Sequence, residues 1–322
     1  MISVSVVVPT FRRPALLERV LGALVGQEPG CTYEIVVADD AASAETRVQV
    51  ARWQARYPGR IFYTAALGEA HGPAAARNAG WRCASGEWIA FTDDDTVPSP
   101  TWLAEAVRGV EQEACSAAWG RIVVPLPERP TDYERDAAGL ETAGFVTANC
   151  FVRRDVLERL GGFDESFRAA WREDSDLYFR LLADGQRVAH LPCAVIVHPV
   201  RPAPWGVSVR QQQKSAYDAL LYRKHPRLFR RFIRPRRPPD YYAAVIATIG
   251  TVGCLVSGFV IGAACGLGAW VMVTVSIARR RLRGNSLAPA HVAEMLVTSA
   301  VLPLASFYWG VRGAMRYRVL FW

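Results

Sequence analysis

A long uncharged segment near the end of the chain places the tightest constraint on the fold. Residues 241–278 are 38 residues without one Asp, Glu, Lys or Arg. As a single helix this segment would be about 57 Å long, nearly twice the hydrocarbon thickness of a bilayer. Two helices of about 20 residues match that thickness, and a turn between them is expected in the Gly-containing stretch 257–262. The segment predicts a transmembrane hairpin; the alternative, a buried helix in a soluble domain, seldom runs this long without charge.

Positive charge flanks this segment on both sides. The chain has 38 Lys and Arg against 30 Asp and Glu, a net charge of +8. Residues 223–237 hold eight of the basic residues and no acid, and a second basic run follows at 279–283. Because cytoplasmic loops are rich in Lys and Arg, both flanks are expected in the cytoplasm, which requires an even number of crossings. A nucleic-acid binder would also be basic, but charge beside an apolar hairpin favours attraction to anionic lipids, and no nucleic-acid partner is expected.

A third apolar segment, residues 292–311, contains Glu294 and Pro303 and is followed by three arginines. A third crossing would place those arginines on the outer side, against the positive-inside tendency. A re-entrant or interfacial helix keeps them inside and is the expected structure.

The first 200 residues alternate short β-type runs with helical patterns. Strands are expected at 3–8, 34–38, 60–64, 88–92 and 194–198, and helices at 14–26, 45–56, 74–84, 99–108, 154–160 and 175–184. Strands separated by helices of about 10 to 15 residues indicate a mainly parallel sheet flanked by helices, an α/β fold. The seven scattered cysteines form no C-x-x-C pair, which indicates reduced, mostly buried thiols rather than a zinc site.

Acidic residues gather where two of these strands end. Asp93, Asp94 and Asp95 directly follow one apolar strand, and Asp39 and Asp40 follow another. Ligands bind at the carboxyl ends of strands in open α/β sheets, and adjacent carboxylates are stabilised by a cation such as Mg²⁺ or Mn²⁺. Each cluster also has a simpler interpretation as a helix cap or an Asx turn.

A third acidic cluster opens a helix. Glu173, Asp174 and Asp176 crowd the first turn of an amphipathic segment. Acidic side chains there interact favourably with the helix dipole, so capping alone accounts for them. In a cleft, one of these carboxylates could instead act as a general base.

Six segments, in order along residues 3–200, resemble the family 2 glycosyltransferases, inverting enzymes with an A-type nucleotide-binding α/β fold. They are VSVVVPTFRRP (4–14), EIVVADDAAS (34–43), AAARNAGW (74–81), IAFTDDDTVPSPTWL (89–103), TANCFVRRDVLERLGGFDESF (147–167) and EDSDLYFRL (173–181). The resemblance implies a nucleotide-sugar donor and a divalent cation, Mn²⁺ or Mg²⁺. On the donor side it implies contacts to the nucleoside or nucleotide from Pro9, Thr10, Arg12, Asp40 (the base) and Arg77.

The Asp-x-Asp motif of the family corresponds to Asp93 and Asp95. The resemblance implies that Asp93 faces the ribose or the metal and that Asp95 binds the metal bridging the diphosphate. Because three Asp are consecutive, Asp94 could take one of these roles and counts among the cofactor-binding candidates. His198, after the strand expected at 194–198, matches a His that often completes the metal site in relatives.

Asp174 matches the catalytic base of these enzymes, with Glu173 supporting it or touching the acceptor. An inverting transfer needs a base on the acceptor hydroxyl and a cation for the charge of the leaving diphosphate. The implied function is sugar transfer to a hydroxyl of a lipid-linked or glycolipid acceptor at the cytoplasmic membrane face, in cell-envelope glycan biosynthesis. Two alternatives remain: transfer to a polyprenyl phosphate, which needs no base, and a non-catalytic scaffold that retains nucleotide-sugar binding.

The expected organisation follows from these segments. A nucleotide-sugar-binding catalytic domain is expected at 1–205, a basic interfacial connector at 206–240, the hairpin at 241–278, and a basic turn with a membrane-associated helix at 279–322. The expected location is the inner or plasma membrane, with several crossings and the catalytic domain in the cytoplasm.

Overall fold

One mixed sheet organises the first 200 residues. The computed structural model describes residues 3–68, 71–233 and 239–321. The chain divides into unit 1, which runs to Pro125 and resumes at Ala138–Val200, and unit 2, which consists of Leu126–Ala137 and the chain from Arg201 onward. The described residues of unit 1 form an eight-stranded sheet in the order β3-β2-β1-β4-β7-β6-β8-β5. Its strands are β1 (Ser3–Thr10), β2 (Thr32–Asp39), β3 (Ile61–Ala65), β4 (Trp88–Thr92), β5 (Val97–Pro98), β6 (Ala117–Val123), β7 (Asn149–Arg153) and β8 (Val188–Val197).

Most strand pairs in this sheet are parallel. β3, β2, β1 and β4 pair in parallel, as do β6 and β8, whereas β7 is antiparallel to both β4 and β6, and β5 is antiparallel to β8. The expected α/β fold with a mainly parallel sheet is confirmed. β6 and β7 are not predicted by the strand pattern, because neither is a continuous apolar run: β6 contains Gly120 and the exposed Arg121, and β7 begins at Asn149 and ends at Arg153.

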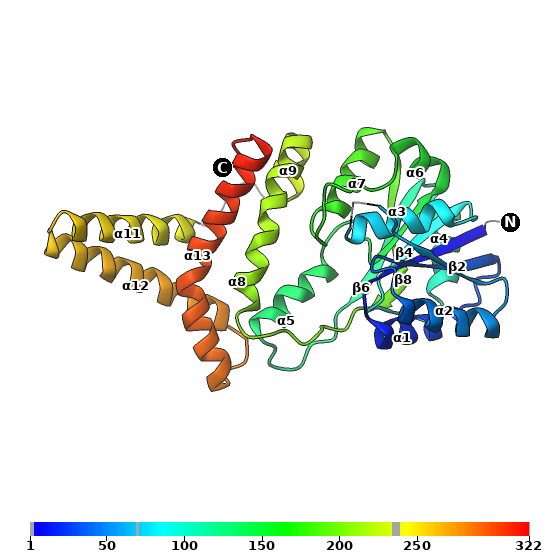
Figure 1. Cartoon of the computed structure of the whole chain (residues 1–322), viewed down its shortest axis with the longest axis horizontal. Helices are drawn as coiled ribbons and strands as arrows, with labels where there is room; N and C mark the ends of the chain where they lie inside the picture. Colours follow the sequence, from blue (N-terminus) through cyan, green and yellow to red (C-terminus); the bar gives the residue numbers. More distant parts are fainter. Residues whose placement is uncertain (1–2, 69–70, 234–238, 322) are drawn as a thin grey trace. The chain divides into compact units, whose positions relative to one another are not determined.

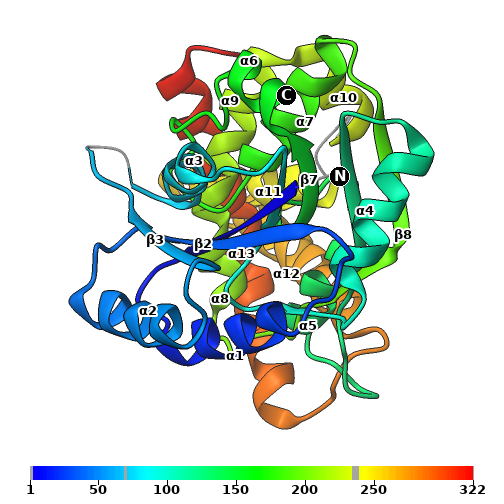
Figure 2. The same ribbon diagram turned by 90° about the vertical axis from the view of Figure 1, so that its right-hand side faces the viewer.

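Helices cover both faces of the sheet. Their bounds are α1 (Pro14–Val25), α2 (Ala44–Arg56), α3 (Pro73–Cys83), α4 (Trp102–Glu113), α6 (Arg154–Leu160) and α7 (Glu173–Ala183). Successive strand residues point to opposite faces, so Val6 and Val8 of β1 pack with Leu17 of α1 in one core, whereas Val7 packs with Trp81 of α3 in the other. Figure 2 shows α1 and α2 on one side of the sheet and α3 and α7 on the opposite side.

Unit 2 is helical. Its helices are α5 (Asp132–Ala137), α8 (Val207–Gln211), α9 (Ala216–Lys224), α10 (Pro226–Phe232), α11 (Pro239–Val256), α12 (Val260–Leu282) and α13 (Pro289–Tyr317), with a 3₁₀ turn at Gln212–Ser215. α11 and α12 are two consecutive helices joined by residues 257–259, within the stretch where the turn is expected. Among the described residues, three helices (α11, α12 and α13) are long and apolar enough to cross a membrane. The basic run predicted at 223–237 lies in this unit, except that residues 234–238 fall outside the described part.

The cysteines are free, as expected, but the expectation that they are mostly buried is wrong. Cys115 and Cys150 are buried, whereas Cys83, Cys193 and Cys265 are exposed. A thiol is small and only weakly polar, so its exposure costs little and sequence pattern does not determine it.

Candidate active site

Parallel pairing brings the ends of three strands of unit 1 together. Thr10, the last residue of β1, is in register with Asp39, the last residue of β2, and Val7 of β1 is in register with Phe91 of β4. The acidic residues that follow β2 and β4 therefore lie at the same edge of the sheet as the end of β1. This edge is the carboxyl end of the parallel strands, where α/β folds bind ligands.

The two aspartates at the end of β2 have different surroundings. Asp39 is fully buried, and its carboxylate accepts hydrogen bonds from the backbone N–H of Ala41 (2.9 Å) and Ser43 (2.7 Å), which makes it an Asx turn. The carboxylate of Asp40 accepts from the backbone N–H of Gly72 at 3.0 Å. The capping interpretation thus describes Asp39, and Asp40 is the member of the pair that faces the start of α3.

The end of β1 supplies the residues expected against a nucleoside. Pro9 and Thr10 are its last two residues and are both buried. The Thr10 hydroxyl donates to Asp94 Oδ2 at 2.8 Å. Arg12 is exposed, has a positive φ of 53°, and its guanidinium lies 5.4 Å from the centre of the Phe11 ring. Thr10 therefore connects the end of β1 to the acidic turn after β4.

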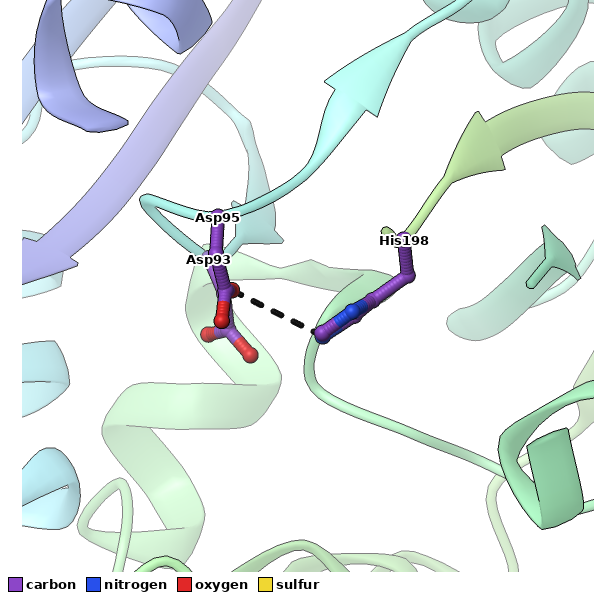
Figure 3. Close-up of side chains that lie close together, drawn as sticks. All are labelled: Asp93, Asp95 and His198. Atoms are coloured by element: carbon purple, nitrogen blue, oxygen red, sulfur yellow. Dashed lines mark ion pairs between the residues drawn. The ribbon is translucent and has the colours of Figure 1, made fainter. Parts of the chain in front are cut away.

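The three consecutive aspartates point in two directions. Asp94 pairs with Arg13 at 3.0 Å as well as with Thr10, and burial raises the pKa of Asp94 despite this ion pair. Asp93 and Asp95 face His198, and ligand atoms of the three side chains all lie within 4.8 Å of one another (Figure 3). The alternation of side-chain direction across the turn places Asp94 apart from the other two.

Asp93, Asp95 and His198 have the composition of a divalent-cation site. His198 Nε2 lies 3.6 Å from Asp95 Oδ1 (Figure 3). Burial opposes the ionisation of Asp93, but Arg77 and His198 outweigh it and hold the pKa of Asp93 below its ordinary value. Two carboxylates and an imidazole are ligands that Mn²⁺ accepts, and a cation between them would relieve the repulsion of the two carboxylates.

Arg77 connects this cluster to the start of α7. Its side chain is 3% exposed; Nη2 donates to Asp93 Oδ1 at 2.7 Å and Nη1 donates to Glu173 Oε1 at 3.0 Å. Its guanidinium also lies 5.8 Å from the centre of the Phe163 ring. The resemblance implies a nucleotide contact for Arg77, whereas in this structure both ends of its guanidinium bind carboxylates.

Glu173 and Asp174 begin α7 side by side. The Asp174 carboxylate accepts from the backbone N–H of Ser175 at 2.6 Å, and Glu173 Oε2 is buried with no hydrogen-bond partner among the described residues. Burial and the neighbouring Asp174 raise the pKa of Glu173 to about 7, and burial raises the pKa of Asp174. The pair therefore binds a proton more tightly than ordinary carboxyl groups do, a property expected of a general base. Asp176 is different, because its carboxylate pairs with Arg180 at 2.8 Å inside the fold.

A turn at residues 161–164 packs closely against α3. Asn78 of α3 donates to the carbonyl of Phe163 (2.9 Å) and accepts from its backbone N–H (2.8 Å). Gly162 has a φ of 74°, and a Cβ there would lie 2.4 Å from Asn78 Oδ1 and 2.6 Å from Trp81 Nε1. The turn at 161–164 therefore needs glycine at this position for both backbone conformation and space.

Two residues of the site are missed by the sequence interpretation. Arg13 holds Asp94, and a basic residue next to the Pro-Thr-Phe-Arg stretch is a signal that could have suggested a partner for one of the aspartates. Arg172 precedes Glu173 in the left-handed region with a φ of 76°. Such strain for a residue with a Cβ gathers at functional sites, and no pattern in the sequence indicates it.

The sequence matches a known family and several curated proteins. The family profile described as "Glycosyl transferase family 2" matches residues 5–173. The validoxylamine A glucosyltransferase of Streptomyces hygroscopicus subsp. jinggangensis is 28% identical over an alignment of 270 positions that covers 70% of this chain and 61% of that protein. The pre-mycofactocin glycosyltransferase of Mycobacterium tuberculosis is 27% identical over 69% of this chain and 48% of that protein. The chain thus spans about 60% or less of the length of these curated relatives.

Solved structures share the fold. The mannosyltransferase PcManGT from Pyrobaculum calidifontis, in complex with GDP-Man and Mn²⁺, aligns with 98% of this chain and 86% of its own, with a TM-score of 0.56 and 22% identity. TarS of S. aureus, residues 1–349 with UDP, aligns with 95% of this chain and 91% of its own, with a TM-score of 0.51 and 16% identity. Because the family profile covers more than half of the sequence, this chain belongs to glycosyl transferase family 2.

Proposed function

We propose that this glycosyltransferase is a metal-dependent, inverting enzyme that moves a sugar from a nucleotide-sugar to a hydroxyl of a lipid-linked or glycolipid acceptor. The observation that carries the proposal is the pair of clusters within unit 1: Asp93, Asp95 and His198 at the ends of strands, and Glu173 with Asp174 at the start of α7. Arg77 bonds to both clusters. A cation site beside a raised-pKa carboxyl pair is the arrangement that such a transfer requires.

The residues proposed to bind the nucleotide-sugar donor lie at or just after the ends of strands. Asp93, Asp95 and His198 would hold Mn²⁺ or Mg²⁺, and their mixed oxygen and nitrogen donors favour Mn²⁺, since Mg²⁺ prefers oxygen ligands. A cation bound by these residues would neutralise the charge that develops on the leaving diphosphate. The Mn²⁺ and GDP-Man in the structurally similar mannosyltransferase support this choice of cation and donor class.

The nucleoside would lie against the end of β1. Pro9 and Thr10 form this end, Arg12 follows it, and Asp40 lies at the same edge after β2. A carboxylate is an acceptor for the N–H groups of a base, which is the role we propose for Asp40. In the described residues Asp94 accepts from Thr10 and Arg13, so its contribution would be to hold the Pro-Thr turn in place.

The acceptor half centres on Asp174. Its carboxylate would take the proton of the acceptor hydroxyl as the new glycosidic bond forms on the face opposite the diphosphate. Glu173 would keep the pair partly protonated before the acceptor binds, because the two adjacent carboxyl groups and their burial disfavour full ionisation. Its Oε2 is buried, so the partly exposed Asp174 is the carboxylate that would meet the acceptor hydroxyl.

The membrane half of the proposal rests on unit 2. Its apolar helices suggest membrane association, and the basic runs beside them suit a cytoplasmic surface rich in anionic lipids. A catalytic unit held at the inner or plasma membrane would meet acceptors that are themselves lipid-anchored. This is why a lipid-linked acceptor is proposed rather than a soluble one.

The test is a transfer and hydrolysis screen of the purified chain with a panel of nucleotide-sugars and either Mn²⁺ or Mg²⁺. We expect one preferred donor, loss of activity with a chelator, and a loss of about 10²-fold or more in kcat for Asp174→Asn and for Asp95→Asn. Asp155→Asn on α6 is the matched control, since Asp155 is exposed and pairs only at the surface. If no donor is preferred and Asp95→Asn does not differ from the wild-type chain, the proposed metal-dependent transfer is refuted.

The same screen separates the alternatives. A polyprenyl phosphate is already an anion and needs no base, so full activity of Asp174→Asn on such an acceptor would favour it over a hydroxyl acceptor. Binding of a nucleotide-sugar without turnover on any acceptor would favour a scaffold.

A further inference from the structure

The hairpin of α11 and α12 is closed at its charged end. Asp240, at the start of α11, pairs with Arg280, near the end of α12. The buried residues of these two helices lie mainly in the part next to this pair, as Ala244, Val245 and Ile277 show. Beyond them the hairpin is exposed on nearly all sides, since only 11% and 17% of the most apolar stretches of α11 and α12 are buried, against 39% for α13. The hairpin therefore has a polar base and a free apolar body.

α13 contacts two different basic segments, one in its first half and the other at its C-terminal end. In its first half, Thr298 and Ser299 accept hydrogen bonds from Arg281, at 2.7 and 3.1 Å; Arg281 belongs to the basic run at the end of α12. At its other end, Arg223 donates to the backbone carbonyl of Tyr317 at 3.3 Å, within the basic run that precedes α11. The ring of Phe321, just after α13, lies 6.0 Å from the ring of Tyr222.

Both basic segments must lie on the same side of a membrane that the hairpin enters. The ion pair of Asp240 with Arg280 places the start of α11 level with the end of α12. From Phe232, the end of α10, to Pro239 there are seven residue steps, which span at most about 25 Å when fully extended. This is less than the ~30 Å thickness of the hydrocarbon core. The end of α10, within the first basic run, is thus held on the same side of the membrane as the basic end of α12.

The segment packed beside α13 also excludes a crossing. The carboxylate of Glu294, near the start of α13, accepts from the backbone N–H of Gly206 at 2.7 Å, and a Cβ on Gly313, near its end, would lie 2.7 Å from the carbonyl oxygen of Ala216. The residues between these contacts include the charged Arg210 and Lys214. Each charge at the centre of a bilayer costs about 2.5 to 3.5 kcal/mol even on insertion scales. A spanning α13 would carry this charged segment into the hydrocarbon core.

We infer that α13 lies in the plane of the membrane at the same surface as both basic runs, and that only the α11–α12 hairpin enters the bilayer core. Figure 1 shows α13 crossing the base of the hairpin, with α8 and α9 running alongside it. This inference rests on the membrane association in the proposed function and goes beyond it. It assigns a partner, the acyl and headgroup region of lipids, to the exposed side of α13.

That side of α13 is a stripe of apolar residues. Val297, Val301, Tyr308 and Met315 are exposed and recur at steps of four or seven residues, which keeps them on one face of the helix. Arg312 is exposed on the same half of the helix and suits a lipid headgroup. An in-plane amphipathic helix buries such a stripe about 5 to 10 Å into the boundary of headgroups and acyl chains.

Depth measurement by electron paramagnetic resonance tests the inference. The full chain, with its exposed cysteines replaced by serine, carries one nitroxide at position 297, 301 or 315 in vesicles that contain anionic lipid. An in-plane α13 predicts similar shallow depths at all three positions, whereas a nitroxide at the exposed Met272 of α12 lies deep. A profile that is deepest at 301 and returns to the headgroup level at 315 would overturn the in-plane placement.

A second measurement needs no substitution in α13. A reporter fused after Trp322 is located relative to the N-terminal unit by protease protection in sealed vesicles. Both are expected on the same side of the membrane; opposite sides would refute the inference. Failure of the proposed function would appear instead as absence of sugar transfer, which neither measurement reads.

Discussion

Replacing Arg77 by Met tests whether this arginine is a structural bridge or a nucleotide ligand. The substitution keeps much of the side-chain volume and removes both ion pairs, leaving the carboxylates of Asp93 and Glu173 without their shared cation. The Glu173 side chain is 5% exposed and the Asp93 side chain is 25% exposed, so the larger cost falls on Glu173. Removing one partner of a buried ion pair costs about 3 to 5 kcal/mol.

The expected loss lies at the lower end of that range. Glu173 already has a pKa of about 7 because of burial and Asp174, so it can take up a proton when Arg77 is gone. We therefore expect a loss of about 3 kcal/mol. In a unit of this size each kcal/mol lowers Tm by about 2 to 4 °C, so Tm should fall by about 6 to 12 °C.

Arg82→Met is the matched control on the same helix. Arg82 is 55% exposed and lies 3.6 Å from Glu165, and an exposed pair of this kind contributes at most about 1 kcal/mol. Its Tm should fall by no more than about 4 °C. Thermal unfolding of both variants and of the wild-type chain is followed by tryptophan fluorescence. Binding of a nucleoside diphosphate to the same three proteins is measured by calorimetry. An unchanged Tm for Arg77→Met with lost nucleotide binding would refute the bridge and support a nucleotide contact.

Three further predictions follow from other contacts. Gly162→Ala should destabilise the chain by about 1 to 3 kcal/mol more than Gly161→Ala, because both glycines have a φ of 74° but only the first would meet neighbouring atoms; chemical denaturation of the two variants measures the difference. Arg281→Met, which leaves Asp132 without its ion-pair partner at 2.7 Å, should lower Tm in detergent clearly more than Arg280→Met. Asp132 and Asp240 are similarly buried (22% and 20% exposed), but Arg281 is 9% exposed and Arg280 is 58% exposed; equal shifts would contradict the buried network around Arg281. Glu173 binds its proton more tightly in the folded chain, with a pKa of about 7 against an ordinary 4.5, so the stability that its protonation contributes is lost as pH rises from about 4.5 to 7. Over this interval the Tm of the wild type should therefore fall relative to the Tm of Glu173→Gln. Parallel Tm curves for the two proteins would refute the pKa shift.

The fold class and the hairpin could be predicted from the sequence because both depend on local patterns. Apolar runs such as 34–38 and 88–92 are strands in the structure, within one or two residues at each end, since a buried strand needs a continuous apolar segment. The hairpin at 241–278 likewise follows from length and absence of charge. β6 and β7 were not predicted, because their place at the centre of the sheet is decided by the strands that pair with them.

The acidic clusters were found from their position after strands, but their division of labour was not. Sequence alone left the roles of the three consecutive aspartates open, and the structure turns Asp94 toward Thr10 and Arg13 while Asp93 and Asp95 face His198. These partners come from strands β1 and β8 and from the loops after them. Which way a side chain points after a strand depends on partners that the sheet brings together.

What the sequence determined by itself is therefore the kind of elements, the place of the acidic residues at strand ends, and the apolar hairpin with its basic flanks. Only the tertiary structure decided that Arg77 bonds to Glu173, 96 positions further along the chain, and that α13 crosses the base of the hairpin. The physical reason is the range of the interactions. Helix and strand patterns arise between neighbours in sequence, whereas buried ion pairs and helix packing arise between segments that meet only after the chain has folded.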